Sequence, residues 1–245
     1  MNFPAISDPN VMAAFPDARL AERDALLELV ELHRDQRVLD VQAAGGFLSD
    51  EVYLRLGGEV ECVCVEPCEE LGLRLNSKFK WLKEDVEYFP SVQGGSIDVV
   101  LGLAGLHHSD SHFDTIKSSY RVLKMGGELA VCDVEQDSSL AAWLNDFVDR
   151  HNPVGHEGRF LKFGQTGDFL DRAGFTAIRE FRKNVPWRFK DKHCAAVFFK
   201  GLFGLDLDLE QVLLAIDEHF DVKEVEHEVF IDWRLIYCYG RRDAV

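Results

Sequence analysis

Short apolar runs alternate with helix-like patterns along most of the chain. Between the runs, apolar residues recur at spacings of three and four, as at Phe113, Ile116 and Tyr120, which predicts helices. The runs themselves predict strands at about 37–41, 60–65, 79–82, 97–102, 127–134, 176–184 and 228–239. This alternation predicts an α/β fold with a doubly wound, mostly parallel sheet and right-handed crossovers. We treat residues 1–245 as a single domain.

Two segments lie outside this alternation. Residues 1–34 form an N-terminal arm followed by a predicted amphipathic helix over 17–33. Residues 186–226 separate the last two strands and predict a helical insert, with a capping box formed by Asp208 and Gln211. Ligands of doubly wound sheets bind beyond the carboxyl ends of the parallel strands. The insert is therefore placed to act as a lid over the cleft, or it only pads the sheet.

The first two predicted strands indicate a nucleoside site. The strand at 37–41 runs into a tight turn that ends at Gly45 and Gly46, and a helix follows. The next strand ends on Glu66, about 20 residues past this turn, where an acid can accept hydrogen bonds from both ribose hydroxyls. The spacing of a dinucleotide-binding loop, Gly-x-Gly-x-x-Gly, does not fit residues 42–46.

The segment from Asp40 to Gly46 resembles the first motif of class I S-adenosylmethionine-dependent methyltransferases, with Gln42 and Ala44 at two of its three glycine positions. Glu66 matches the ribose acid of that family. Further segments resemble the family in the same order, at 84–90, 96–108, 120–129 and 169–175. The resemblance covers about 36–183.

The resemblance implies both the sheet and the cofactor. It implies seven strands in the order 3-2-1-4-5-7-6, with strand 7 antiparallel, and S-adenosylmethionine as the cofactor. Asp85 would meet the adenine amino group. The cofactor residues that it assigns are Asp40, Gln42, Ala44, Gly46, Glu66, Asp85, Val86 and Leu103.

Gln42 leaves three functions open. Its side chain would project toward the methionyl part of the cofactor, where it would either obstruct binding or hydrogen-bond the carboxylate. We rank methyl transfer to a small-molecule or carrier-bound acceptor first, because Glu66 and Asp85 match the family by residue type. The alternatives are a non-methylating use of the cofactor, such as cyclisation or elimination, and a non-catalytic binding or scaffold role.

Histidines are the candidate catalytic bases, because imidazole titrates near neutrality. His107 and His108 follow the fourth predicted strand, and His156 lies in a loop before a predicted helix. A packing role is the alternative for His107. At the end of the fifth strand, Asp133 and Glu135 are candidates for orienting the substrate.

The sequence predicts no metal site. His107, His108 and His112 lie close to Asp110 in the chain. However, adjacent side chains at a strand end should point apart, and no thiol or helical histidine pair completes a tetrahedron.

Composition narrows the partners. A formal net charge of −16 argues against a nucleic acid substrate. Basic residues nevertheless crowd 179–192, which indicates either a solvated edge strand or an anionic substrate nearby. Six scattered cysteines and no signal-like or membrane-spanning run predict a cytoplasmic protein without a membrane partner. The oligomeric state is left open.

Overall fold

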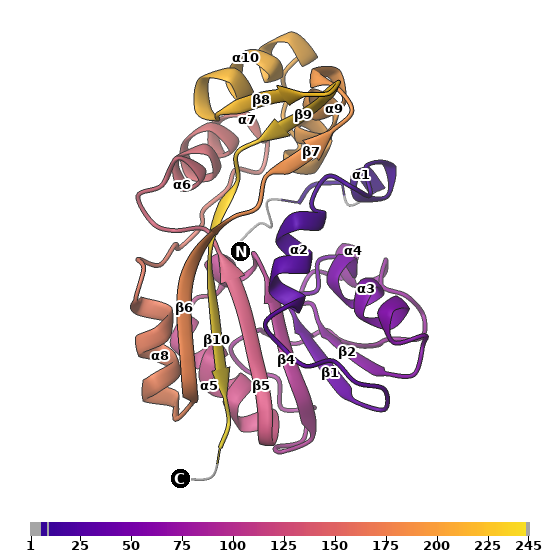
Figure 1. Cartoon of the computed structure of the whole chain (residues 1–245), viewed down its shortest axis with the longest axis vertical. Helices are drawn as coiled ribbons and strands as arrows, with labels where there is room; N and C mark the ends of the chain where they lie inside the picture. The colour runs from indigo at the N-terminus through magenta and orange to yellow at the C-terminus, as the bar shows by residue number, and fades with distance from the viewer. Residues whose placement is uncertain (1–5, 9, 244–245) are drawn as a thin grey trace.

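A seven-stranded sheet forms the body of the computed structural model, which describes residues 6–8 and 10–243 (Figure 1). The order of its strands is β3-β2-β1-β4-β5-β10-β6, and β10 is antiparallel to both β5 and β6. In chain order the strands are β1 Arg37–Val41, β2 Glu61–Val65, β3 Lys80–Leu82, β4 Ile97–Leu103, β5 Leu123–Asp133, β6 Thr176–Asn184 and β10 Arg234–Arg241. Because β10 is the seventh strand of this sheet along the chain, the predicted order and the antiparallel seventh strand are confirmed.

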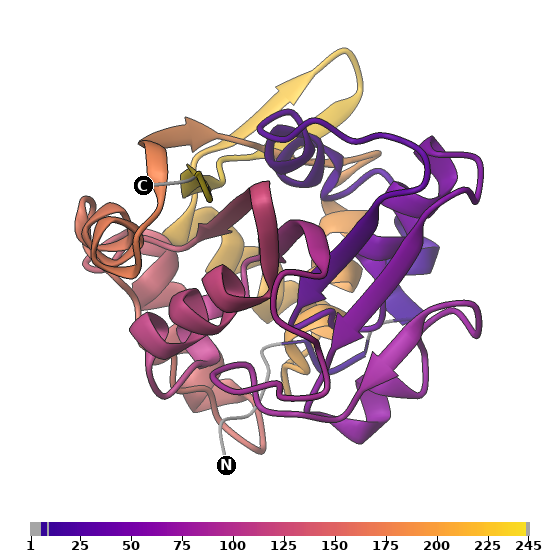
Figure 2. The same ribbon diagram turned by 90° about the horizontal axis from the view of Figure 1, so that it is seen from below.

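Helices cover both faces of the sheet, as the view from below shows (Figure 2). Alternate residues of β1 point to opposite faces. Val38 packs in the apolar cluster that includes Leu26, whereas Leu39 packs in the cluster that includes Ile116. The helices around the sheet are α2 Leu20–Leu27, α3 Phe47–Arg55, α4 Glu69–Gly72, α5 His112–Val122 and α8 Gln165–Ala173.

The N-terminal segment contains two short helices, α1 Asn10–Ala14 and α2. The predicted helix over 17–33 is therefore too long. After α2 the chain tightens into a turn in which the Leu29 amide donates to the carbonyl of Leu26, three residues earlier. Val30 is still buried, so the apolar pattern reported burial correctly beyond the end of the helix.

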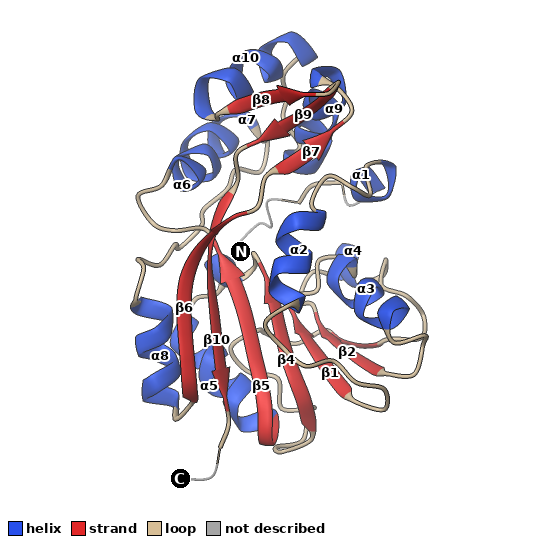
Figure 3. Cartoon of the chain, viewed as in Figure 1, coloured by secondary structure: helices blue, strands red, loops and turns tan. Residues whose placement is uncertain are grey.

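A smaller α/β unit lies above one end of the sheet (Figure 3). Its strands pair antiparallel in the order β7-β9-β8. The unit consists of β7 Trp187–Phe189, α9 Lys192–Phe203, α10 Leu209–His219, β8 Val222–Val225 and β9 Glu228–Ile231. The insert predicted over 186–226 contains the helices α9 and α10 and the capping box at Asp208 and Gln211, and it also contains the short strands β7 and β8, which were not predicted. A helical stretch formed by α6 Ser139–Ala142, a π-helix Trp143–Val148 and α7 Asp149–His151 supports the unit from below.

The strand predicted over 228–239 divides into β9 and β10, which belong to different sheets. The division falls at Trp233, whose ring stacks on Trp187 with 3.7 Å between the ring centroids. The Trp233 carbonyl also accepts a hydrogen bond of 2.6 Å from the Val185 amide. These contacts fix the crossing where the two chain segments leave the large sheet and enter the smaller one.

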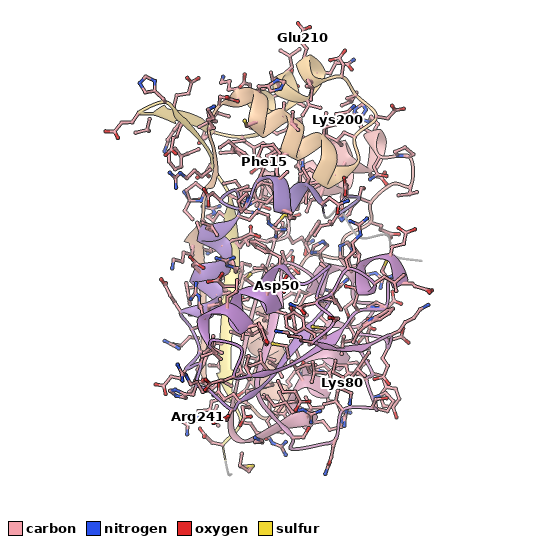
Figure 4. All side chains as sticks on the ribbon, turned by 90° about the vertical axis from the view of Figure 1, so that its right-hand side faces the viewer. Phe15, Asp50, Lys80, Lys200, Glu210 and Arg241 are labelled. Atoms are coloured by element: carbon pink, nitrogen blue, oxygen red, sulfur yellow. The ribbon has the colours of Figure 1, made fainter. Side chains whose placement is uncertain are left out.

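The smaller unit lies at the carboxyl ends of the parallel strands. Figure 4 shows Lys200 of α9 and Glu210 of α10 at one end of the molecule, and Lys80 and Arg241 at the other. Lys80 begins β3, and Arg241 ends the antiparallel β10.

In the described part of the chain, no helix combines the length and apolar character needed to cross a bilayer.

Glu22 of α2 links the N-terminal segment to both sheets. Its side chain is fully buried and pairs with the guanidinium of Arg19. The indole nitrogen of Trp187 donates to Glu22 Oε2 at 2.8 Å, and the Tyr237 hydroxyl donates to the Glu22 carbonyl at 3.0 Å. One buried residue therefore holds α2, the smaller unit and β10 together.

Replacing Glu22 should destabilise the fold. Glu22→Ala leaves the buried Arg19 charge and the Trp187 N–H without a partner, so the free energy of unfolding should fall by about 3 kcal/mol. Urea unfolding followed by tryptophan fluorescence measures this loss. The control is Glu28→Ala, which breaks only an exposed pair with Lys183 and should cost less than about 0.5 kcal/mol. Equal stability of the two variants would contradict the assigned role.

Candidate functional site

Glu66, just past the end of β2, links the loop after β1 to the loop after β2 at the carboxyl ends of these strands. Its side chain is 1% exposed. One carboxylate oxygen accepts from the Ala44 amide at 2.8 Å, and the other accepts from the Cys68 amide at 2.9 Å. Burial raises the pKa of Glu66, and this effect outweighs the two amide bonds, which lower it. Each oxygen has a second lone pair, so the carboxylate can still accept hydrogen bonds from a ligand.

The loop after β1 keeps a left-handed backbone where the family motif has glycines. Gln42 has a φ of 65° and Ala44 a φ of 45°. This conformation costs a residue with a side chain on the order of 1 kcal/mol. The Gln42 side chain packs against Gly105, since a methyl group added to Gly105 would lie 3.0 Å from Gln42 Oε1. The loop therefore keeps the backbone conformation that glycine favours, although Gln42 and Ala44 stand at two of the glycine positions.

Asp40, in β1, is a second buried acid in this region. It is 3% exposed and accepts a hydrogen bond of 2.6 Å from the Ser49 hydroxyl. Burial raises the pKa of Asp40 to about 7, with a smaller contribution from the charge of Glu66, and the Ser49 bond offsets part of the rise. The protonation of Asp40 therefore changes near neutral pH.

These residues border one cavity that extends from the β1 loop to the smaller unit. It contains about 930 Å³ of space between protein atoms, including the part open to solvent. Its lining includes Arg19, Asp40, Gln42, Ala44, Phe47, Glu66, Leu103, His107, His108, Trp187, Leu202, Phe203 and Trp233. The acids lie near the carboxyl ends of β1 and β2, whereas Trp187, Leu202 and Phe203 come from the smaller unit.

The cavity brings together only part of the predicted cofactor set. Asp40, Gln42, Ala44, Glu66 and Leu103 line it. Three other predicted residues are not among the lining residues. Asp85 is exposed, Val86 is buried beside a separate void, and Gly46 caps α3 with a φ of 100°.

Sequence reasoning missed Arg19, Trp187 and Trp233, which also line the cavity. Trp187 lies at the start of the insert predicted over 186–226 and Trp233 follows it, so the position of the insert over the cleft was the available signal. Arg19 falls within the helix predicted over 17–33, but nothing in the apolar pattern marked Arg19 as a lining residue.

His107 is held in the cavity wall by Asp133. It lies in the 3₁₀ turn Leu106–His108, directly after β4. Its Nδ1 is 2.7 Å from one Asp133 oxygen, and its backbone amide donates to the other at 2.8 Å. Burial acts to raise the pKa of Asp133, but His107 and the amide bonds outweigh it, and the pKa is lowered. Asp133 therefore orients His107. Glu135 instead forms a two-point ion pair with Arg182 and does not line the cavity.

His156 lies next to His107 and His108 but does not line the cavity. Burial and the neighbouring His107 lower the pKa of His156 to about 4. Burial and the neighbouring His107 and His156 lower the pKa of His108 well below its usual value. Both rings are therefore neutral at pH 7. Such a low pKa makes His156 a weak base, although it was among the predicted bases.

The assumption that the rings of His107 and His108 point apart is wrong. Their centroids are 4.0 Å apart, because residues 106–108 form a 3₁₀ turn and not an extended strand end. Neither His112 nor Asp110 belongs to the resulting cluster. His156, from a distant loop, completes it instead.

The basic residues of 179–192 are mostly paired with acids. The ion pairs are Arg182 with Glu135, Lys183 with Glu28, Arg188 with Glu228 and Lys192 with Asp217. Because these charges are neutralised by acids, the segment 179–192 is better interpreted as a solvated edge than as an anion-binding surface.

Comparison with known proteins agrees with this geometry. Residues 39–131 match the sequence model of the methyltransferase domain family. A comparison with curated proteins found no match. Among solved structures, the YcgJ protein from Bacillus subtilis is 16% identical with a TM-score of 0.64, and the alignment covers 91% of this chain and 99% of that one.

Two further structures share the fold. A possible histamine N-methyltransferase from Thermotoga maritima is 18% identical, with a TM-score of 0.63, and the alignment covers 96% of this chain and 94% of that one. The cyclase SpnF is 15% identical, with a TM-score of 0.62, and the alignment covers 91% of this chain and 81% of that one.

The strand order defines a Rossmann-like fold, and the buried acid Glu66 follows the end of β2. Residues 39–131 match the methyltransferase domain family, and the whole chain has a methyltransferase-like fold.

The raised pKa of Asp40 should make stability depend on pH. In the unfolded chain the carboxyl ionises near pH 4, whereas in the folded protein it stays neutral until about pH 7. The folded state binds the extra proton in this window, so stability falls as the pH rises. The free energy of unfolding of Asp40→Asn minus that of the wild type should increase from pH 4 to 7 by up to about 1.4 kcal/mol per pH unit, then level off.

Urea titrations at pH 4.5, 6 and 8 measure this difference. Asp50→Asn is the matched control, because Asp50 is less buried and should show a smaller dependence. A difference between Asp40→Asn and wild type that is independent of pH would contradict a raised pKa.

Proposed function

We propose that the protein transfers a methyl group from S-adenosylmethionine to a small acceptor with a large apolar or aromatic part. The observation that carries this proposal is that one cavity is lined by both acidic and aromatic side chains. Glu66 and the β1 loop line one end of it, and Trp187, Phe203 and Trp233 line the other. Such a cavity suits a polar nucleoside next to an apolar acceptor, either free or bound to a carrier.

The cofactor would supply an electrophilic methyl group on a sulfonium. In-line transfer gains mainly from orientation and from exclusion of water. The buried Glu66 carboxylate would hold the ribose, and the Gln42 amide would hydrogen-bond the methionyl carboxylate. The smaller unit would exclude water, because Trp187, Leu202 and Phe203 belong to the cavity wall. We further propose that the smaller unit acts as a lid that closes over the cavity when ligands bind.

An acceptor that must lose a proton needs a base. In the metal-free protein His107 is best placed for this role, because Asp133 holds its Nδ1 and its Nε2 has no hydrogen-bond partner among the described residues. Transfer to an acceptor that is already nucleophilic needs no base.

A non-methylating use of the cofactor is the second candidate. It is favoured by the two left-handed non-glycine residues in the β1 loop, Gln42 and Ala44, which depart from the family motif at a conformational cost. The similarity to the cyclase SpnF adds that a protein with this fold is named for another reaction. Under this candidate the cofactor remains bound while the acceptor rearranges. A non-catalytic binding role would instead leave the cavity without the cofactor.

Glu66 should dominate cofactor affinity. Glu66→Ala removes a buried, charged acceptor of the ribose hydroxyls, so the dissociation constant of S-adenosylhomocysteine should rise at least tenfold, as about 1.5–3 kcal/mol implies. Isothermal titration calorimetry measures the constant. Glu69→Ala is the control, since Glu69 pairs with Lys83 and does not line the cavity. An unchanged constant for Glu66→Ala would remove Glu66 from the site.

The double variant Gln42→Gly with Ala44→Gly separates an enzyme from an empty fold. If the Gln42 amide binds the methionyl carboxylate, the double variant should bind S-adenosylmethionine about fivefold more weakly, or about 1 kcal/mol, although glycine relaxes the backbone. Ala44→Gly alone is the matched control and should bind as the wild type does. Tighter binding by the double variant, together with an inactive wild type, would favour the non-catalytic role.

A further inference from the structure

We propose that His107, His108 and His156 form a binding site for a divalent transition metal ion, with Zn²⁺ as the best fit. Each residue offers one ring nitrogen, and these three atoms all lie within 4.8 Å of one another. The rings come from two separate parts of the chain, the turn after β4 and the loop after α7. Imidazole nitrogens are typical ligands of zinc, copper, iron and nickel.

Hydrogen bonds set which ring nitrogen of His107 carries the proton. The Asp133 carboxylate can only accept at His107 Nδ1, so Nδ1 carries the hydrogen and Nε2 presents a lone pair. A carboxylate behind a histidine is also the usual support of a metal ligand, because it orients the ring and raises its basicity.

Asn145 fixes His156 in the same way. The Asn145 amide nitrogen donates to the Gly158 carbonyl at 2.7 Å, and its oxygen accepts from the Gly158 amide at 2.7 Å. The orientation of the amide is therefore determined, and its oxygen faces His156 Nδ1 at 3.0 Å. His156 Nδ1 must then be the donor, which leaves His156 Nε2 with a lone pair.

Two buried lone pairs thus lie in one cluster without hydrogen bonds. Among the described residues, neither His107 Nε2 nor His156 Nε2 has a hydrogen-bond partner, and the two residues are 4% and 3% exposed. Buried polar atoms without partners are rare in native proteins and call for a bound ion or water. A cation that binds both nitrogens satisfies them together.

The chemistry of the cluster favours a metal ion over a proton. Two of the ring nitrogens are buried without a hydrogen bond among the described residues, and neutral imidazole is the form that coordinates metals. In a tetrahedral zinc site the ligand nitrogens are about 3.3 Å apart, so the rings would have to approach by no more than about 1.5 Å.

The site would border the proposed acceptor space, since His107 and His108 also line the cavity. Three protein ligands leave zinc a fourth position. If the proposed methyl transfer is correct, the metal would bind an acceptor hydroxyl or thiol and lower its pKa, with release of the proton to water. His107 would then act as a ligand and not as the base.

Metal titration of the tag-free, full-length protein tests the proposal without any cofactor, so its outcome is independent of the methyltransferase assignment. After chelator treatment, calorimetry with Zn²⁺ should show one equivalent bound with submicromolar affinity. Co²⁺ should give the intense visible absorption of a tetrahedral site. His156→Gln and His108→Gln should each weaken Zn²⁺ binding at least 100-fold, and Asp133→Asn about tenfold.

His33→Gln is the control for adventitious binding, because the His33 side chain is 68% exposed and distant in the chain from the cluster. It should leave the constant unchanged. Circular dichroism checks that each variant folds. The proposal is overturned if the wild type binds no stoichiometric Zn²⁺, or if folded His156→Gln and His108→Gln bind it as tightly as the wild type does.

Discussion

The buried pair formed by Arg19 and Glu22 is the constraint on which the two-part architecture depends. Glu22 accepts from the Trp187 indole, and its carbonyl accepts from Tyr237, so a single residue joins α2 to the smaller unit and to the large sheet. Arg19 and Trp187 also belong to the cavity wall. Because the partners of a buried ion pair cannot separate without leaving an unpaired charge, this network holds α2 and Trp187 together at one wall of the cavity.

At the other side of the cavity, Glu66 likewise holds two parts of the chain in fixed positions. By accepting from the amides of Ala44 and Cys68, it ties the β1 loop to the loop after β2 before any ligand binds. A site prepared in this way avoids part of the entropy cost of binding. It also explains how Ala44 is kept in a left-handed conformation, since the loop cannot relax without breaking a buried, charged hydrogen bond.

Sequence reasoning succeeded where the signal was periodic. The strands and the placement of Glu66 followed from apolar runs and one turn, whereas the order of the strands came from the resemblance to the methyltransferase family. The small sheet was missed because β7 and β8 have only three and four residues, too few to show an alternation. The cluster of His107 with His156 was equally hidden. It depends on a 3₁₀ turn and on Asn145, and neither leaves a local pattern.

The two ends of the cavity differ in electrostatics, and this difference fits the proposed reaction. Asp40 and Glu66 form an acidic end, whereas the imidazole of His108, whose pKa is lowered by burial, is neutral. A sulfonium donor is a cation, so it would favour the ionised forms of both acids and be attracted to that end. Transfer of the methyl group removes this charge. The acids would then hold the thioether product less strongly than the donor, so the same charges that select the cofactor would favour release of its product.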